Sequence, residues 1–136
     1  RLSATEWLEG GWGVEDSVRL AGLLADRGVD FMDVSSAGNV LARIPTDPGY
    51  QVPLARAVRA AGLPTGAVGR ITEAAQAQEV LDEHSADAVL LGRVALREPS
   101  WPLRAAAELG SPERGRYPNA YLRGRWTSLV TQPERS

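Results

Sequence analysis

The sequence predicts an α/β fold built on a parallel sheet. Four times along its 136 residues, a short apolar run ends in small or polar residues and is followed by a helical pattern. This alternation is typical of successive βα units. Hydrophobic residues make up 43% of the chain, which is enough to bury a core. We therefore expect four βα units that fold around a common core.

The first two units are predicted as follows. A strand over residues 1–4 precedes a helix over about residues 15–27, whose first turn is acidic and suits the positive end of the helix dipole. The second unit has a strand over residues 29–34, a long loop and a short helix over residues 53–62, which begins at a proline. Glycine follows the first helix and closes the second, as expected at helix ends.

The third and fourth units repeat the pattern. A strand over residues 64–68 leads to a helix that Thr72 can cap. The buried stripe of that helix is predicted to consist of Ala74, Ala77, Val80 and Leu81. A last strand over residues 87–91 is followed by a helix over about residues 100–109.

Four βα units amount to half of an eight-stranded barrel, and alone they leave two open sheet edges and one uncovered face. We therefore predict a parallel (βα)8 TIM barrel, of which residues 1–110 supply the last four units and residues 111–136 form a C-terminal tail. Because strand-like sequence starts at Arg1, we expect an N-terminal half-barrel to precede it. Two associated copies of the chain are an alternative way to cover the face.

The composition excludes several classes of function. The net charge of −2 comes from dispersed residues, so no basic stripe indicates nucleic acid. The absence of cysteine excludes disulfides and thiolate metal sites and fits the cytoplasm. No apolar run is long enough to span a membrane. No metal-ligand cluster, carboxylate pair or activated nucleophile is evident, so we predict no metal and no catalytic residue in this segment.

A phosphate site is predicted at the carboxyl ends of the last two strands, where parallel barrels commonly bind phosphate. Residues 65–69 (TGAVG) have no bulky side chain, so main-chain N–H groups can approach an oxygen closely. Gly92 and Arg93 add a second close-approach glycine and a guanidinium suited to phosphate. Either element by itself is more often a turn or a structural ion pair.

For several other residues the sequence gives weaker indications of a functional role. The hydroxyl of Ser35 ends the second strand and could bind phosphate or cap the loop, and capping is favoured for the residue in isolation. Arg1 in a barrel mouth needs an anionic partner, and the alternative is an intramolecular salt bridge. His84 is expected on the surface. Packing between helices is expected for Trp7, Trp12 and Trp101.

Five groups of motifs occur in order along residues 1 to 110: RLSA at 1–4, DVSS at 33–36, PGYQVP at 48–53, TGAVG at 65–69, and LGR at 91–93 with LREP at 96–99. Together they resemble the C-terminal half of the Old Yellow Enzyme family of NADH:flavin oxidoreductases, in its bacterial branch of xenobiotic and ene-reductases. Ordered agreement over most of the chain is more specific than any one short string.

The resemblance implies an FMN-dependent oxidoreductase, with NADPH or NADH as reductant, that reduces activated alkenes by hydride transfer through the flavin. It implies that Arg1 lies at the flavin pyrimidine edge, where a positive charge stabilises the anionic reduced flavin. It also implies that Ser35, Gly69, Gly92 and Arg93 surround the FMN phosphate. In the family, the residues near flavin N5, the substrate-binding pair and the proton donor belong to the first half.

Near the C-terminus, Tyr121-Leu122-Arg123 is similar to the family segment that enters a neighbouring subunit's active site. The resemblance implies a homo-oligomer in which Arg123 contacts that site. The chain departs from the family by continuing through residues 124–136, and the alternative is a disordered basic tail.

Two other functions remain open at this point. The same glycines and Gly92-Arg93 would serve a phosphate-binding barrel without flavin, such as an isomerase or aldolase. A non-enzymatic half-barrel that self-associates and binds a phosphorylated ligand is the third interpretation.

Overall fold

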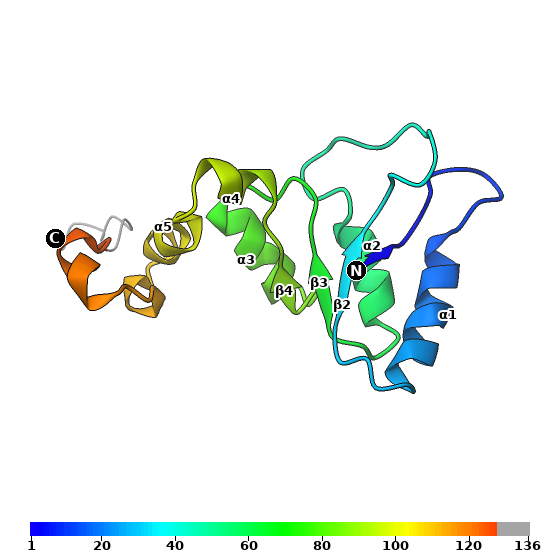
Figure 1. Ribbon diagram of the computed structural model, residues 1–136, viewed down its shortest axis with the longest axis horizontal. Coiled ribbons are helices and arrows are strands. Elements are labelled where there is room, and N and C mark those ends of the chain that lie inside the picture. Colours follow the sequence, from blue (N-terminus) through cyan, green and yellow to red (C-terminus); the bar gives the residue numbers. More distant parts are fainter. Residues whose placement is uncertain (128–136) are drawn as a thin grey trace, which may run out of the picture. The chain divides into compact units, whose positions relative to one another are not determined.

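The computed structural model describes residues 1–127 (Figure 1). The chain divides into two compact units. The first contains residues 1–71 and 77–91, and the second contains residues 72–76 and the chain from Gly92 onward.

A parallel four-stranded sheet in the order β1-β2-β3-β4 forms the centre of the first unit. Its strands are β1 (Leu2–Ser3), β2 (Met32–Ser35), β3 (Thr65–Ala67) and β4 (Ala88–Val89). Leu2 pairs with Val34, and Ala67 pairs with Val34 on one side and Val89 on the other. The α/β class, the parallel sheet and the sequential strand order are therefore confirmed, although each strand is shorter than predicted.

Three helices accompany this sheet, and one of them packs against its central strands. They are α1 (Val14–Ala25), α2 (Val52–Arg59) and α3 (Ala74–Asp82), the last of which begins in the second unit. The α2 helix packs against α1 and against β2 and β3. Met32 and Val34 alternate with half-buried residues along β2 and are 4% and 0% exposed. The core therefore lies between the sheet and the helices.

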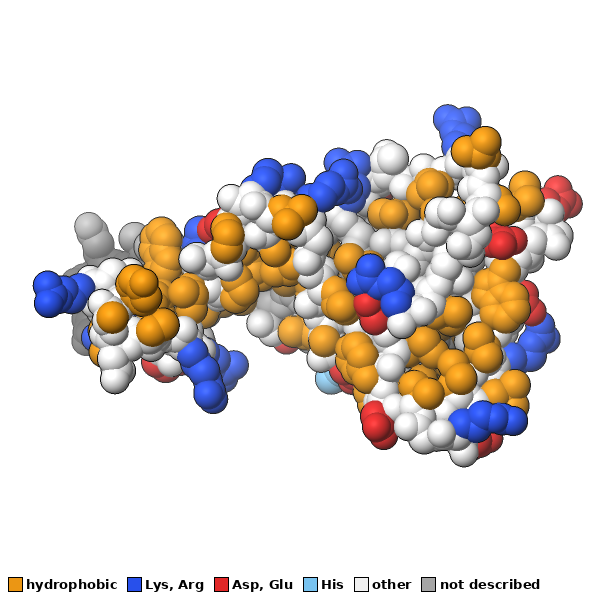
Figure 2. Space-filling view, viewed as in Figure 1, with side chains coloured by type: hydrophobic (Ala, Val, Ile, Leu, Met, Phe, Trp, Pro, Cys, Tyr) orange, Lys and Arg blue, Asp and Glu red, His pale blue; other side chains and the backbone are white. Residues whose placement is uncertain are grey.

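We call the other face of the sheet the open face, because an apolar side chain on it remains exposed within residues 1–127. Asp33 and Gly66 pair across it, and Phe31 lies two residues before Asp33 and so on the same face. A Cβ atom added at Gly66 would meet the ends of the Phe31 and Leu90 side chains, so these two groups converge above the glycine. Phe31 nevertheless keeps 44% of its surface exposed, and hydrophobic side chains are visible over the strands in Figure 2.

Asp87 ties α2 to the amino-terminal ends of β3 and β4. Its carboxylate accepts two hydrogen bonds from Arg59, at 2.9 and 3.0 Å, and one from the backbone N–H of Thr65 at 2.8 Å. The Arg59 guanidinium, followed by the Thr65 N–H, lowers the pKa of Asp87 below its usual range. The charged form of Asp87 therefore stabilises the join between helix and sheet.

The second unit contains α4 (Arg93–Arg97), α5 (Trp101–Glu108) and two 3-10 helices, η1 (Pro112–Arg114) and η2 (Asn119–Gly124). Trp101 is 6% exposed, and its indole N–H donates to the carbonyl of Thr72 at 2.7 Å. The packing role predicted for Trp101 is thus confirmed. The sequence pattern does not predict α4, because five residues are too few to show a helical period.

The Thr72 hydroxyl, expected to cap α3, donates instead to the Glu73 carboxylate at 3.1 Å, while the Thr72 N–H donates to the Gln76 side chain at 3.1 Å. Within residues 1–127, no helix is both long and apolar enough to cross a membrane.

The Asp87 ion pair leads to a pH-dependent prediction. Because the folded-state pKa is lowered, the stabilisation is present above the unfolded-state pKa and is lost as pH falls through the folded-state value. We expect Asp87→Asn to lower the unfolding free energy by about 1 kcal/mol at pH 7, a value reduced for partial exposure, and by less below about pH 4. Urea unfolding at several pH values measures this. Asp30→Asn, at an exposed residue without a side-chain hydrogen bond in residues 1–127, is the control; an equal loss in both variants would contradict the prediction.

Candidate functional site

The carboxyl ends of β1, β2 and β3 meet at one edge of the sheet in the first unit, because the strands are parallel. The Ala4 N–H donates to the Ser35 carbonyl at 2.8 Å, and the Leu90 N–H donates to the Ala67 carbonyl at 2.8 Å. The sheet therefore holds the segments that follow its strands close to one another. Ligands of parallel α/β proteins bind at this edge.

Gly69 follows β3 in a conformation that favours glycine, with φ of +121°. Its carbonyl accepts the N–H of Gly49 at 2.8 Å. A Cβ atom at Gly69 would lie only 2.6 Å from the side-chain nitrogen of Gln51. The Gly69 residue is buried, yet its own N–H donates to no group within residues 1–127. A buried N–H usually has a partner, so this amide is a candidate donor for a ligand oxygen.

Gln51 connects two of the strand-end segments. It is 4% exposed and directly precedes α2. Its side-chain oxygen accepts from the Ser36 hydroxyl at 2.7 Å, and its side-chain nitrogen donates to the Val68 carbonyl at 3.2 Å. The indole N–H of Trp7 in turn donates to the Ser36 oxygen at 3.0 Å. The buried amide therefore has partners at both of its ends.

The sequence indicates no individual role for Gln51 and predicts that Trp7 packs between helices. That expectation is wrong for Trp7, which lies at the strand ends and packs beside Tyr50 with ring centroids 6.4 Å apart. Trp7 has a φ of +57°, and a positive φ is uncommon for residues other than glycine. The sequence therefore gave no indication of this backbone conformation. For Gln51, the signal that the sequence offered was its place inside the PGYQVP motif.

Arg1 forms an ion pair on the open face of the sheet. Its Nε atom donates to Oδ2 of Asp33 at 2.6 Å. The Asp33 side chain is 18% exposed and that of Arg1 is 58% exposed. Oδ1 of Asp33 is buried without a hydrogen-bond partner in the described residues. The salt-bridge interpretation of Arg1 is therefore confirmed, and the exposed part of the guanidinium still faces solvent.

Ser35 ends β2 on the same face as Asp33. Its hydroxyl donates to the Leu2 carbonyl at 3.3 Å, which is longer than the usual range for such a bond. Because a hydroxyl rotates freely, this weak contact leaves Ser35 able to donate to a ligand oxygen.

Gly92, Arg93 and Arg123 belong to the second unit. Arg93 is the exposed first residue of α4, and Arg123 is exposed in η2. Neither arginine forms an ion pair within the described part of the chain. A Cβ atom at Gly92 would meet nothing within 4 Å, so packing does not require a glycine there. Their predicted functions remain predictions.

His84 follows α3 and is exposed, with a φ of +54°, which confirms its predicted surface position. Within residues 1–127, no group of three or more His, Cys, Asp or Glu side chains could hold a metal ion.

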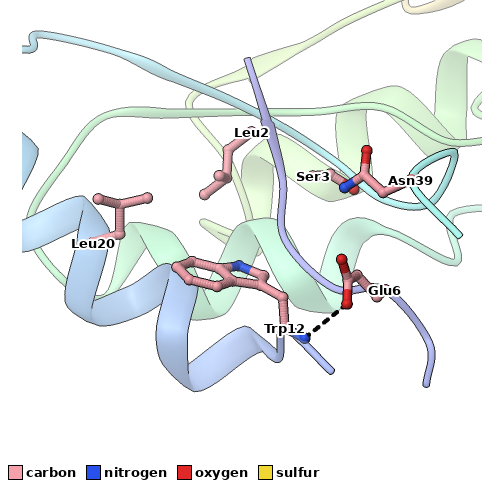
Figure 3. A pocket seen from close by; sticks show the side chains of 6 residues that line it. All are labelled: Leu2, Ser3, Glu6, Trp12, Leu20 and Asn39. Carbon is pink, nitrogen blue, oxygen red and sulfur yellow. Dashed lines mark hydrogen bonds between the residues drawn. The ribbon is translucent and has the colours of Figure 1, made fainter. Parts of the chain in front are cut away.

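An open hollow of about 430 Å³ lies beside the edge strand β1 (Figure 3). Leu2, Leu20 and Trp12 form its apolar side. Ser3, Glu6 and Asn39 are its polar lining residues. The backbone N–H of Trp12 donates to the Glu6 carboxylate at 3.0 Å, so this polar group is already engaged. None of its six lining residues is among those predicted to bind phosphate.

The Gly69 geometry gives a direct prediction. We expect Gly69→Ala to lower the unfolding free energy by about 1–3 kcal/mol, because the new methyl group collides with Gln51 and the positive φ is strained for alanine. Gly22→Ala in α1 is the matched control. Since a Cβ there meets nothing within 4 Å, we expect it to stabilise the helix by about 0.5–1 kcal/mol. Urea unfolding of both variants decides, and a Gly69→Ala protein as stable as the parent would contradict the prediction.

No family model matches this chain. It is 46% identical over 125 residues to an NADPH dehydrogenase of Halalkalibacterium halodurans, which covers 90% of this chain and 37% of that protein. It is 51% identical over 111 residues to an NADPH dehydrogenase of Geobacillus thermodenitrificans, covering 81% of this chain and 33% of that protein. A Listeria monocytogenes NADPH dehydrogenase is 42% identical over 124 residues, or 90% and 36% of the two chains. The chain thus spans about a third of the length of these curated relatives. With this identity over most of its own length, the chain is a homologue of part of these NADPH dehydrogenases, which belong to the Old Yellow Enzyme family.

Proposed function

We propose that this chain is part of an FMN-dependent oxidoreductase that uses NADPH or NADH to reduce activated alkenes. One observation carries the proposal: proteins named NADPH dehydrogenase match 81–90% of the chain at 42–51% identity. The share of this segment in that activity is to bind FMN.

We further propose that additional βα units cover the open face of the sheet and complete a (βα)8 barrel. The open edges at β1 and β4 and the exposed Phe31 ring support this, because apolar strand faces are normally buried in parallel sheets. The greater length of the relatives supports it as well.

The FMN phosphate is proposed to bind the Gly69 N–H and the Ser35 hydroxyl, with Gly92 and Arg93 assigned to the same group by their motif. The chemistry of these groups fits the ligand. An N–H without a partner, a rotatable hydroxyl and a guanidinium without an ion pair in residues 1–127 are all donors, which is what a phosphate dianion requires.

Arg1 is proposed to place positive charge at the pyrimidine edge of the flavin. Bound FMN would supply hydride transfer between the nicotinamide and the alkene. Asp33 orients the Arg1 guanidinium through the 2.6 Å ion pair. The guanidinium is therefore held in position before a ligand binds. No residue of this chain is assigned to proton transfer.

Arg123 is proposed to reach a neighbouring subunit of a homo-oligomer and contact the alkene there. Its exposure in η2, beside the exposed Tyr121 and Leu122 side chains, supports a role in contacts beyond this chain. Residues 128–136 of the predicted tail lie outside the described residues.

FMN titration tests the proposed function. We expect the protein expressed in its native host to bind FMN and to show flavin absorption in the visible range. Arg93→Ala should weaken FMN binding by roughly tenfold or more, since it removes a charge-assisted hydrogen bond to phosphate. Arg97→Ala, at the other end of the same helix, is the matched control. A protein that is colourless after incubation with saturating FMN and removal of the unbound flavin would overturn the proposal.

Substrate kinetics test Arg123. We expect Arg123→Ala to raise KM for an enone several-fold while leaving the FMN dissociation constant unchanged, because the proposed contact is to the alkene and not to the phosphate. Arg125→Ala is the neighbouring control. A loss of FMN binding, or an unchanged KM, would contradict this assignment.

A further inference from the structure

Three consecutive strand-end segments are joined by one line of hydrogen bonds. Trp7 follows β1, Ser36 follows β2 and Val68 follows β3. The line runs from the Trp7 indole to Ser36 at 3.0 Å, from Ser36 to Gln51 at 2.7 Å, and from Gln51 to the Val68 carbonyl at 3.2 Å. Each polar group in it is satisfied by the next, which is the condition for a buried network to be stabilising.

Gln51 is the only group in this line that uses a donor and an acceptor at opposite ends of one side chain. It is 4% exposed, so water cannot readily replace either contact if it is removed. It also lies against the Cα atom of Gly69, because a Cβ there would be 2.6 Å from its nitrogen. The side chain therefore touches both the carbonyl that precedes Gly69 and Gly69 itself.

Within residues 1–127, the segment after β3 has no second side-chain amide that anchors it. Gly69 and Arg70 both have positive φ angles, +121° and +54°. Gly69 and Arg70 make two further hydrogen bonds: one from the Gly49 N–H to the Gly69 carbonyl and one from the Arg70 guanidinium to the Thr46 carbonyl. Both lead to the loop that ends at Gln51. The conformation of Gly69 thus depends on how this loop is held.

We propose that Gln51 is a positioning residue for phosphate binding: it holds the Val68–Gly69 backbone against the Ser36 segment, so that the Gly69 N–H points to the ligand. This inference rests on the proposed function for the identity of the ligand. It places Gln51 behind the phosphate-binding backbone, with no contact to FMN. Its effect is specific for the phosphate, since the flavin ring would be bound elsewhere in the site.

The test compares FMN with riboflavin, which lacks the phosphate, in the parent protein and in Gln51→Met. Methionine has a similar length and no charge, so it removes both hydrogen bonds without repelling an anion. We expect FMN affinity to fall by roughly tenfold, the range for groups that lose buried hydrogen bonds, with riboflavin affinity nearly unchanged. Gln78→Met, which removes an amide that bonds Asp82 on α3, is the matched control.

A second measurement needs no flavin. Trypsin cleaves after Arg70. If Gln51 holds the segment after β3 in place, this segment should be cut several-fold faster in Gln51→Met than in the parent or the control. Equal losses of FMN and riboflavin affinity, or unchanged binding of both, would overturn the phosphate-specific role. If the parent binds no FMN, the proposed function fails. Faster cleavage after Arg70 in Gln51→Met would still support the anchoring of the Val68–Gly69 backbone by Gln51, and unchanged cleavage would contradict it. Should Gln51→Met not fold, Ser36→Ala, which breaks the same line, takes its place in both measurements.

Discussion

Parallel pairing of the four strands is the constraint on which the rest of the first unit depends. It brings Trp7, Ser36 and Val68 to one edge although they are far apart in sequence. Once these segments meet, one buried amide can bridge them, and its cost of burial is offset because both ends have partners. Strand register and buried polar contacts therefore act together to set the backbone of the candidate site.

The two faces of the sheet have different roles. The helix-covered face is apolar and contains Val34 and Ala67, both fully buried. The open face carries the Arg1–Asp33 pair beside Phe31. A charged pair is tolerated there because the guanidinium remains partly in solvent. The same face is incomplete as a core, which agrees with a chain that spans about a third of its relatives' length.

Asp33 shows how structural and functional explanations of one residue can both hold. Its Oδ2 atom accepts from Arg1, while Oδ1 is buried without a partner in the described residues. A half-satisfied carboxylate is costly in a finished core. That cost is lower where additional chain or a ligand supplies a partner for the free oxygen. The other oxygen of Asp33 gives the Arg1 guanidinium a defined orientation.

The sequence alone determined the α/β class, the four βα units and the family, since hydrophobic periodicity and short ordered strings are local properties of the chain. It also placed Gly69 after β3 and allowed the salt bridge of Arg1. It did not identify α4, the partner Asp33, or the positions of Trp7 and Gln51. Those depend on which distant segments the strand pairing brings together, and on backbone angles such as the positive φ of Trp7. Only the tertiary structure decided them, because a buried hydrogen bond between remote residues leaves no period in the sequence.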